Sequence, residues 1–237
     1  MLGLRFRSGG FWAGGAGLRL LGEKCDSFFT PDGALLTKKF NRGSYDPNAV
    51  AKAELRREAI ARRDVLPAAE RQLAAETIAA REFPAAVASS TVVSGFFPMK
   101  SEISPIPLLR KLAALGARLA LPVVAGKGKP LIMRAWSPGE PLVAGVWGIR
   151  EPGPEAPEVE PDILIVPLLA FDRHGHRIGY GAGYYDLTIA KLREKKPVVA
   201  AGIALAVQEI VAVPTTPSDV RLDLVLTESE VIDCRAT

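Results

Sequence analysis

Cysteine, histidine and methionine are scarce in this chain of 237 residues, which has two, two and three of them respectively. The cysteines, Cys25 and Cys234, lie near opposite ends, which excludes a disulfide framework and a cysteine-rich metal site and fits a reducing compartment. The histidines, His174 and His176, form only an H-x-H pair without a third metal ligand nearby. No apolar run of about eighteen residues occurs, so we expect no membrane-spanning helix and no membrane partner.

Acidic residues are rare near the N-terminus, and this imbalance accounts for the whole net charge of +4. Residues 1–43 contain seven lysines and arginines but only three acidic residues, whereas the remainder of the chain is formally neutral. A nucleic-acid-binding domain usually carries a basic patch on its folded body, not on a leader segment. We therefore expect no nucleic-acid partner.

The N-terminal segment also differs in composition. Its first 43 residues hold nine glycines and show no sustained helical or strand period. We expect residues 1–45 to form a poorly ordered, basic, glycine-rich extension and residues 46–237 to form the folded domain. We also expect a cytoplasmic monomer. The alternative is an organelle transit peptide, which would place the protein in an organelle matrix, but serine is sparse and glycine too frequent for a convincing amphipathic helix.

Helical and strand-like segments alternate from Asp46 onward. Asp46 is a good N-cap and Pro47 suits the first helical turn, so a helix should run from there to Pro67. Further helices are expected over 68–82, 105–115 and 184–196, and strands over 91–97, 117–124, 131–136, 163–171, 198–205 and 222–227. Such alternation predicts an α/β class: a single domain with a mostly parallel or mixed central sheet flanked by helices, and with an N-terminal helical pair.

The strongest local signal is the stretch FDRHGHRIGYGAGYYD, residues 171–186, between an apolar strand and a helix start. Alternating glycines let the backbone take positive φ and approach a ligand closely. Backbone amides and the helix N-terminus can then face phosphate oxygens, and Arg177 can pair with phosphate. The spacing matches neither a dinucleotide fingerprint nor a Walker A loop, and a plain glycine turn before a helix is the alternative.

This stretch resembles the signature of the 5-formyltetrahydrofolate cyclo-ligase family, also called methenyltetrahydrofolate synthetases. The resemblance extends over about residues 46–228 and includes, in order, KAELRR, FFPMKSEI, ALPVV, WSPGE, GVWGIREP and LDLVLTE. Two positions depart from the family pattern. Ala182 replaces a glycine or basic residue, which puts a side-chain contact from that position in doubt. Leu187 replaces a frequent arginine, so a possible extra phosphate contact is absent.

The resemblance implies an ATP site. It places the ATP phosphates against Lys52 and Arg56, whose i,i+4 spacing puts them on one helix face. Without the resemblance, such a pair is usually a solvated basic face. It also implies catalytic roles for Arg177 and Asp186. The implied ATP-binding residues are Lys52, Arg56, Arg177, Ile178, Gly179, Tyr180, Gly181, Ala182, Gly183, Tyr184 and Tyr185.

A folate site and a magnesium site follow from the same resemblance. Glu102 lies in the loop PMKSEIS after a strand, and the family's matching glutamate contacts the pterin ring of the folate. A carboxylate can accept two N–H bonds from that ring. The implied substrate-binding residues are Phe97, Met99, Glu102, Trp147 and Tyr184; Trp147 is equally well explained as a core aromatic. Asp186 and Asp223 would hold Mg²⁺ with the nucleotide phosphates, although Asp186 could merely cap its helix.

The implied function is the ATP-dependent cyclisation of 5-formyltetrahydrofolate to 5,10-methenyltetrahydrofolate, with release of ADP and phosphate. The partners are thus ATP and a reduced folate. A non-catalytic nucleotide- or RNA-binding regulator on the same scaffold is the main alternative. The neutral body and the retained candidate residues favour the enzyme. An unrelated sugar-phosphate-binding protein is a third possibility, but it would give the Glu102 loop no purpose.

Overall fold

The computed structural model describes residues 25–29, 35–39 and 47–235. The chain divides into two compact units, Met1–Tyr45 and Asp46–Thr237. In the first unit, β1 (Cys25–Phe29) pairs antiparallel with β2 (Leu35–Lys39). The composition of this segment predicts no strand, so the hairpin differs from expectation. The remainder of residues 1–45 lies outside the described residues, and its poor order stays a prediction.

A seven-stranded sheet forms the centre of the second unit. Its spatial order is β13-β12-β11-β8-β3-β4-β5, with the four inner pairings parallel and the two edge pairings antiparallel. This confirms the α/β class with a mostly parallel sheet. The strands are β3 (Val92–Ser94), β4 (Arg118–Val123), β5 (Ile132–Ala135), β8 (Ile163–Pro167), β11 (Val199–Ile203), β12 (Leu224–Leu226) and β13 (Val231–Asp233).

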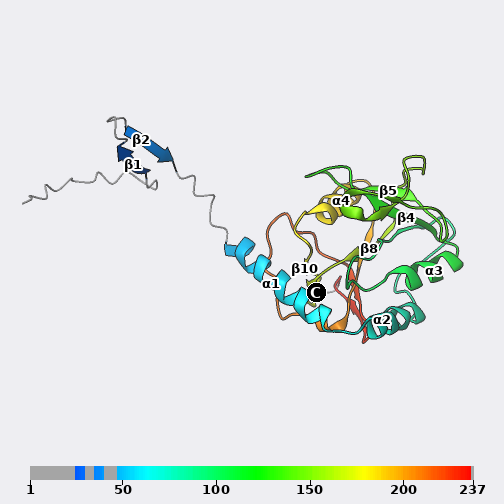
Figure 1. Cartoon of the computed structure of the whole chain (residues 1–237). Coiled ribbons are helices and arrows are strands. Elements are labelled where there is room, and N and C mark those ends of the chain that lie inside the picture. Colours follow the sequence, from blue (N-terminus) through cyan, green and yellow to red (C-terminus); the bar gives the residue numbers. More distant parts are fainter. Residues whose placement is uncertain (1–24, 30–34, 40–46, 236–237) are drawn as a thin grey trace, which may run out of the picture. The chain divides into compact units, whose positions relative to one another are not determined.

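Alternation along each inner strand buries both faces of the sheet. Ile163 and Ile165 of β8 pack with α2 (Ala68–Ala80) and α3 (Ile106–Ala114). Leu164 and Val166, on the other face, pack with α4 (Tyr184–Arg193). Successive side chains of a strand point to opposite faces, so a continuous apolar run is what a doubly covered parallel strand requires. Figure 1 shows α2 and α3 together on one side of the sheet and α4 on the other.

Helix α1 (Pro47–Asp64) lies apart from these two layers and contacts β9 (Ala170–Phe171), β10 (Arg177–Ile178) and the short helix η2 (Ala206–Gln208). Its buried Ala59 packs in a small separate cluster with Leu169 and Ile178. The predicted N-terminal helical pair, α1 and α2, is confirmed. Helix α1 is therefore anchored to the chain just before the glycine-rich loop.

Three segments differ from the expected pattern. The apolar run 163–171 is divided: β8 ends at Pro167, and Ala170–Phe171 turn to pair antiparallel with β10. Proline has no N–H to continue a ladder. The side-chain amide of Gln208 donates to the carbonyl oxygens of Leu168 and Leu169, the two residues that follow Pro167. β13 follows the last expected strand as an added edge strand. A small hairpin of β6 (Val143–Ala144) and β7 (Arg150–Glu151) surrounds the short helix η1 (Val146–Gly148).

The order of the strands identifies where ligands should bind. From β3 the chain crosses to β4 on one side, whereas β8, β11 and β12 extend the sheet in the other direction. The order therefore reverses between β3 and β8. In open α/β sheets, the carboxyl ends of strands at such a reversal form the crevice that binds ligands. The loop that follows β3 carries Glu102, and the segment that follows β8 leads through β9 and β10 to the glycine-rich loop.

Candidate active site

The glycine-rich loop joins β10 to α4. Gly181 and Gly183 have φ of 98° and 69°, left-handed values that other residues adopt only with strain, whereas Gly179 does not have a positive φ. Gly183 directly precedes α4, so the loop ends at a helix N-terminus whose first N–H groups lack intrahelical partners. An anion is favoured at such a helix end by both its free donors and the helix dipole.

Helix α1 supports this loop through Arg56. Its Nε donates to the carbonyl oxygen of Gly179 at 2.9 Å. A Cβ added at Gly181 would come within 3.2 Å of the Arg56 guanidinium carbon, so a side chain there would press on Arg56 in addition to the strain of the positive φ. The expected ATP-site residue Arg56 therefore does reach the glycine-rich loop.

Lys52, one turn earlier on α1, forms an ion pair with Asp219. The lysine side chain is 12% exposed and the aspartate 25%. Burial acts to raise the pKa of Asp219, but the hydrogen bonds from Lys52 and Thr216 outweigh burial and lower this pKa. Lys52 is thus a partly buried cation held beside the loop, and the sequence analysis did not identify Asp219 as its partner.

Arg177 and Asp186 form the next ion pair. Nη2 of Arg177 donates to Oδ1 of Asp186 at 2.8 Å, and the backbone N–H of Val220 donates to the same oxygen at 3.0 Å. The arginine side chain is 5% exposed, and burial lowers its pKa although Asp186 opposes that shift. Asp186 lies in the first turn of α4. The two residues expected to be catalytic are therefore in direct contact.

The loop after β3 carries Glu102 as a buried carboxylate. Its Oε2 accepts a hydrogen bond from the backbone N–H of Met99 at 2.8 Å, and Lys100 between them has a φ of 53°. Its Oε1 is buried with no hydrogen-bond partner among the described residues. Burial raises the pKa of Glu102, while Met99, Tyr180 and the charge of Arg63 act to lower it. A buried carboxylate oxygen left without a donor is costly unless a ligand supplies one.

Two of the three tyrosines in the glycine-rich signature, Tyr180 and Tyr185, interact with the charge of Glu102 in the loop after β3. Burial raises the pKa of Tyr185, the charge of Glu102 acts in the same direction, and Arg177 opposes it. The Tyr185 hydroxyl is buried without a partner among the described residues. The two loops meet through Arg63 of α1, which donates to Ser101, the residue before Glu102, and to the Tyr180 hydroxyl of the glycine-rich loop. The expected folate-binding and phosphate-binding loops therefore lie side by side.

The other expected site residues differ in how far their side chains are buried. Ile178 is 1% exposed and packs in the cluster with α1, so its side chain is a core group and does not face the loop. Phe97, Met99 and Tyr184 are half-buried, and Ala182 is exposed. Trp147 belongs to η1, and its side chain lies outside the described structure.

The fold does not place Asp223 beside Asp186, the other residue expected to bind magnesium. It directly precedes β12, at the amino end of that parallel strand, where its Oδ2 accepts from Arg193 and from the backbone N–H of Ala200, both at 2.7 Å. Arg193 is the last residue of α4, whereas Asp186 is in the first turn. Among the described residues, no group of three or more histidine, cysteine, aspartate or glutamate side chains could hold a metal ion.

Arg63 is a residue of the site that the sequence analysis missed. It is 1% exposed; its Nε donates to Ser101 at 3.0 Å and its Nη2 to the Tyr180 hydroxyl at 3.1 Å. The signal was present in the helical period, because Arg63 follows Lys52 by eleven residues, or about three turns. Lys52, Arg56 and Arg63 therefore share one face of α1.

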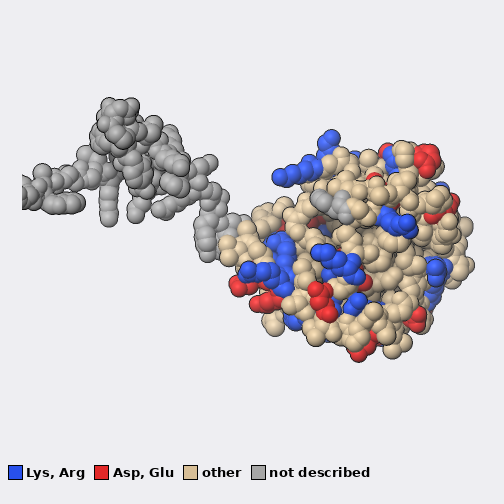
Figure 2. All heavy atoms as spheres, viewed as in Figure 1, with Lys and Arg blue, Asp and Glu red and all other residues tan. Residues whose placement is uncertain are grey.

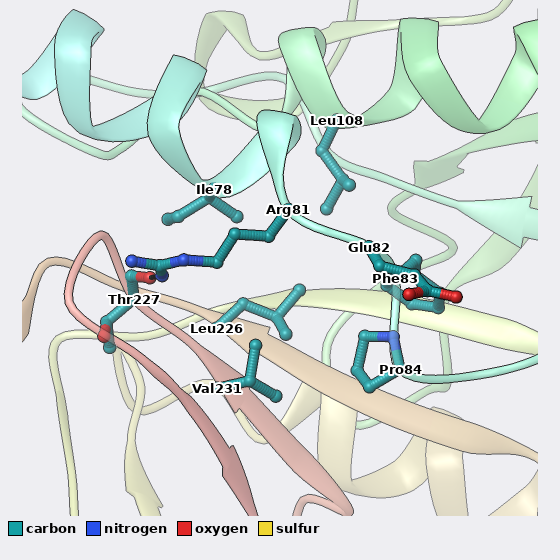
Figure 3. A pocket seen from close by; sticks show the side chains of 9 residues that line it. All are labelled: Ile78, Arg81, Glu82, Phe83, Pro84, Leu108, Leu226, Thr227 and Val231. Carbon is teal, nitrogen blue, oxygen red and sulfur yellow. Dashed lines mark hydrogen bonds between the residues drawn. The ribbon is translucent and has the colours of Figure 1, made fainter.

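Two hollows lie elsewhere in the unit. Figure 3 shows a small one, where the Arg81 side chain reaches toward Thr227 beneath the end of α2, and its volume of about 10 Å³ suits a water molecule at most. A wider one, of about 690 Å³, is lined by Arg173 and His174. There Arg173 is already bound by Glu209 and Glu230.

Comparison with known proteins agrees with this geometry. Residues 48–228 match the model of the 5-formyltetrahydrofolate cyclo-ligase family. The 5-formyltetrahydrofolate cyclo-ligase of Mycolicibacterium smegmatis is 36% identical over 185 residues, covering 75% of this chain and 93% of the relative. That of Escherichia coli is 34% identical over 159 residues, covering 63% and 84%. The NMR structure of Aquifex aeolicus 5,10-methenyltetrahydrofolate synthetase has a TM-score of 0.64 at 30% identity, covering 78% of this chain and 93% of that one.

Proposed function

The chain belongs to the 5-formyltetrahydrofolate cyclo-ligase family, and on that premise we propose that it converts 5-formyltetrahydrofolate and ATP to 5,10-methenyltetrahydrofolate, ADP and phosphate. The observation that carries the proposal is the meeting of two loops at the sheet reversal. Arg63 joins the loops, because it donates to Ser101, beside the buried carboxylate Glu102, and to Tyr180, three residues from the buried guanidinium of Arg177. The Glu102 carboxylate suits the donor edge of a pterin and the Arg177 guanidinium suits a phosphate.

The phosphates of ATP are assigned to the glycine-rich loop. Lys52 and Arg177 supply fixed positive charge there, Arg56 supports the loop, and the α4 N-terminus supplies free backbone N–H groups. Cations held in place before the substrate arrives stabilise charge that develops during transfer without reorganising. Both Lys52 and Arg177 already bind a carboxylate, so ATP phosphates would have to share or replace Asp219 and Asp186 as their partners.

The folate ring is assigned to Glu102, with Phe97 and Met99 as the apolar wall. Glu102 has one oxygen without a partner and the other accepting a single hydrogen bond, so both can take N–H groups from the pterin. Tyr184 and Trp147 stay proposed contacts to the substrate. This placement puts the folate beside the glycine-rich loop, because Arg63 donates both to Ser101, next to Glu102, and to Tyr180 of that loop.

The chemistry needs positioning more than covalent catalysis. The formyl oxygen attacks the γ-phosphorus, the bond to the β-phosphate oxygen breaks, and ADP leaves. The formyl carbon then carries phosphate, a far better leaving group than the original amide-like oxygen. The N10 amine attacks that carbon, loses its proton and expels phosphate to close the ring. Holding the two substrates in line and neutralising charge is the main contribution of the protein.

Magnesium is proposed as the ion that accompanies ATP, neutralising charge on its phosphates. One carboxylate is enough for such a site, because magnesium usually keeps several waters and binds substrate phosphates. Asp186 fits that role: it lies in the first turn of α4 with its side chain 26% exposed, and its Oδ1 accepts from Arg177 and Val220. Asp223 fits less well, since the far end of α4 and the start of β12 hold it.

The remaining expectations are proposals of the same kind. The activity is assigned to residues 46–237, which the match over 48–228 supports. Basic and acidic side chains are interspersed over the face drawn in Figure 2, which favours the enzyme over an RNA-binding regulator. No helix among the described residues is long and apolar enough to span a membrane. A cytoplasmic monomer stays a prediction.

The direct test is to incubate the purified full chain with 5-formyltetrahydrofolate and magnesium-ATP, following methenyl absorbance and phosphate release together. We expect one phosphate for each methenyl product, and no product when ATP is omitted. Product formed at the same rate without ATP would contradict the mechanism. Total inactivity of a folded protein that still binds ATP would favour the regulator.

A further inference from the structure

Arg63 and Glu102 each present one buried polar atom without a partner. Arg63 is 1% exposed and Glu102 8%, yet Nη1 of the arginine and Oε1 of the glutamate make no hydrogen bond among the described residues. Buried donors and acceptors are almost always paired in folded proteins, and a binding site awaiting its ligand is a recognised exception. One unpaired donor and one unpaired acceptor thus occur on two neighbouring side chains.

Two hydrogen bonds fix the position of the Arg63 guanidinium. Its Nε donates to Ser101, the residue before Glu102, at 3.0 Å, and its Nη2 donates to Tyr180 at 3.1 Å. The Ser101 hydroxyl donates in turn to Asp64. One guanidinium therefore joins the end of α1 to both loops of the site. Because the guanidinium is planar, these two bonds also fix Nη1, the one of its nitrogens that makes no hydrogen bond among the described residues.

A pterin presents a matching order of groups along one edge. Its 2-amino group and N3–H are donors, and the exocyclic 4-oxo oxygen beside N3 is an acceptor. A carboxylate takes the two donors, and a guanidinium next to that carboxylate takes the acceptor. We propose that Arg63 donates to the 4-oxo oxygen of the folate pterin while Glu102 accepts from the adjacent N–H groups, an inference that rests on the proposed function. The two residues would then together select a 4-oxo ring.

The proposal predicts a specificity that a purely structural arginine would not produce. A 4-amino pteridine replaces the 4-oxo acceptor with a donor, which would face the Arg63 guanidinium with no acceptor between them, and its N3 lacks the hydrogen that Glu102 accepts from the 4-oxo ring. Leaving a buried charged donor unpaired typically lowers affinity by about 10- to 150-fold. The wild-type protein should therefore prefer 5-formyltetrahydropterin to its 4-amino counterpart by a factor in that range.

The test measures inhibition constants of these two ring compounds against folate turnover at saturating ATP. Arg63→Met removes all donors while keeping an unbranched apolar chain, and Arg63→Lys keeps the charge without the fork. Arg57→Met is the matched control, because Arg57 lies on the same helix with its side chain 78% exposed. We expect both Arg63 variants to lose the part of the preference for the 4-oxo ring that Arg63 supplies, the methionine variant more, with the KM for ATP little changed and Arg57→Met like wild type.

Three results would overturn the inference: no preference in the wild-type protein, an undiminished preference in both Arg63 variants, or equal weakening of both ring compounds together with ATP. The last would assign Arg63 a structural role only. If Arg63→Met does not fold, the lysine variant alone decides. Failure of the wild-type protein to form any methenyl product is a different outcome, since it would contradict the proposed function itself.

Discussion

Arg177 donates from Nη2 to Oδ1 of Asp186 at 2.8 Å, so the buried cation nearest the α4 N-terminus is held by the first turn of that helix. Arg177→Ala should raise the KM for ATP or lower kcat by about 10- to 150-fold, because a charged hydrogen bond to phosphate is lost. The folate KM should change little. Arg173→Ala is the control, since that arginine is half-exposed and binds Glu209 and Glu230. A collapse of folate affinity with normal ATP affinity would reverse our assignment of the two loops.

Glu102 should make folate binding pH-dependent. Burial raises its pKa above the ordinary value of 4.5, and only the ionised form accepts both pterin donors. The KM for folate should therefore increase as the pH falls through that raised pKa. Glu102→Gln should have a higher folate KM throughout, without this pH dependence, and near-normal ATP affinity. Steady-state kinetics from acid to neutral pH would reveal the difference; a parallel pH profile in the variant would contradict it.

The same pKa shift has a consequence for stability with the opposite sign. Because the pKa of Glu102 is raised on folding, the folded state binds its proton more tightly than the unfolded state. The carboxyl group therefore contributes less stability as the pH rises from 4.5 through the raised value. Without substrate, Glu102→Gln should thus gain stability relative to wild type as the pH rises through this window. Thermal unfolding at several pH values measures this. A difference in melting temperature between the two proteins that stays constant with pH would contradict the raised pKa of Glu102.

Asp186 and Asp223 should behave differently although both are aspartates bound by arginine. Asp186→Asn should raise the magnesium concentration needed for half-maximal turnover, since one ligand charge is lost. Asp223→Asn should leave the magnesium dependence unchanged and lower stability by about 1 kcal/mol through weaker bonds to Arg193 and Ala200. Magnesium titrations and melting temperatures of the pair decide this. A magnesium effect confined to Asp223→Asn would restore it as the metal ligand.

Local patterns along the chain predicted most of the elements, since apolar runs, proline positions and the glycine cluster act over a few residues. The run 163–171 was expected as one strand, because its composition is uniformly apolar. The structure ends β8 at Pro167, where a missing N–H stops the ladder. The edge strand β13 carries no strong alternation in its three residues, and it forms by pairing with β12.

Long-range relations within the site were harder to predict. Glu102 and the glycine-rich loop meet because β3 and β8 are neighbours in the sheet, and no local pattern encodes strand order. For the same reason, Asp223 could be grouped with Asp186 although they lie at opposite ends of α4. Ile178 stands within the signature stretch but points into the core. Arg63 could have been found, because its helical spacing repeats the face of Lys52 and Arg56.

The central claim is that the formyl oxygen attacks ATP in a site shared by the two loops. The most direct measurement uses 5-formyltetrahydrofolate whose formyl oxygen is a heavy isotope, with mass analysis of the phosphate released during a single turnover. Because that oxygen bonds to the γ-phosphorus and leaves with it, we expect one heavy oxygen in each phosphate. Phosphate that contains no heavy oxygen, formed together with methenyl product, would contradict the mechanism.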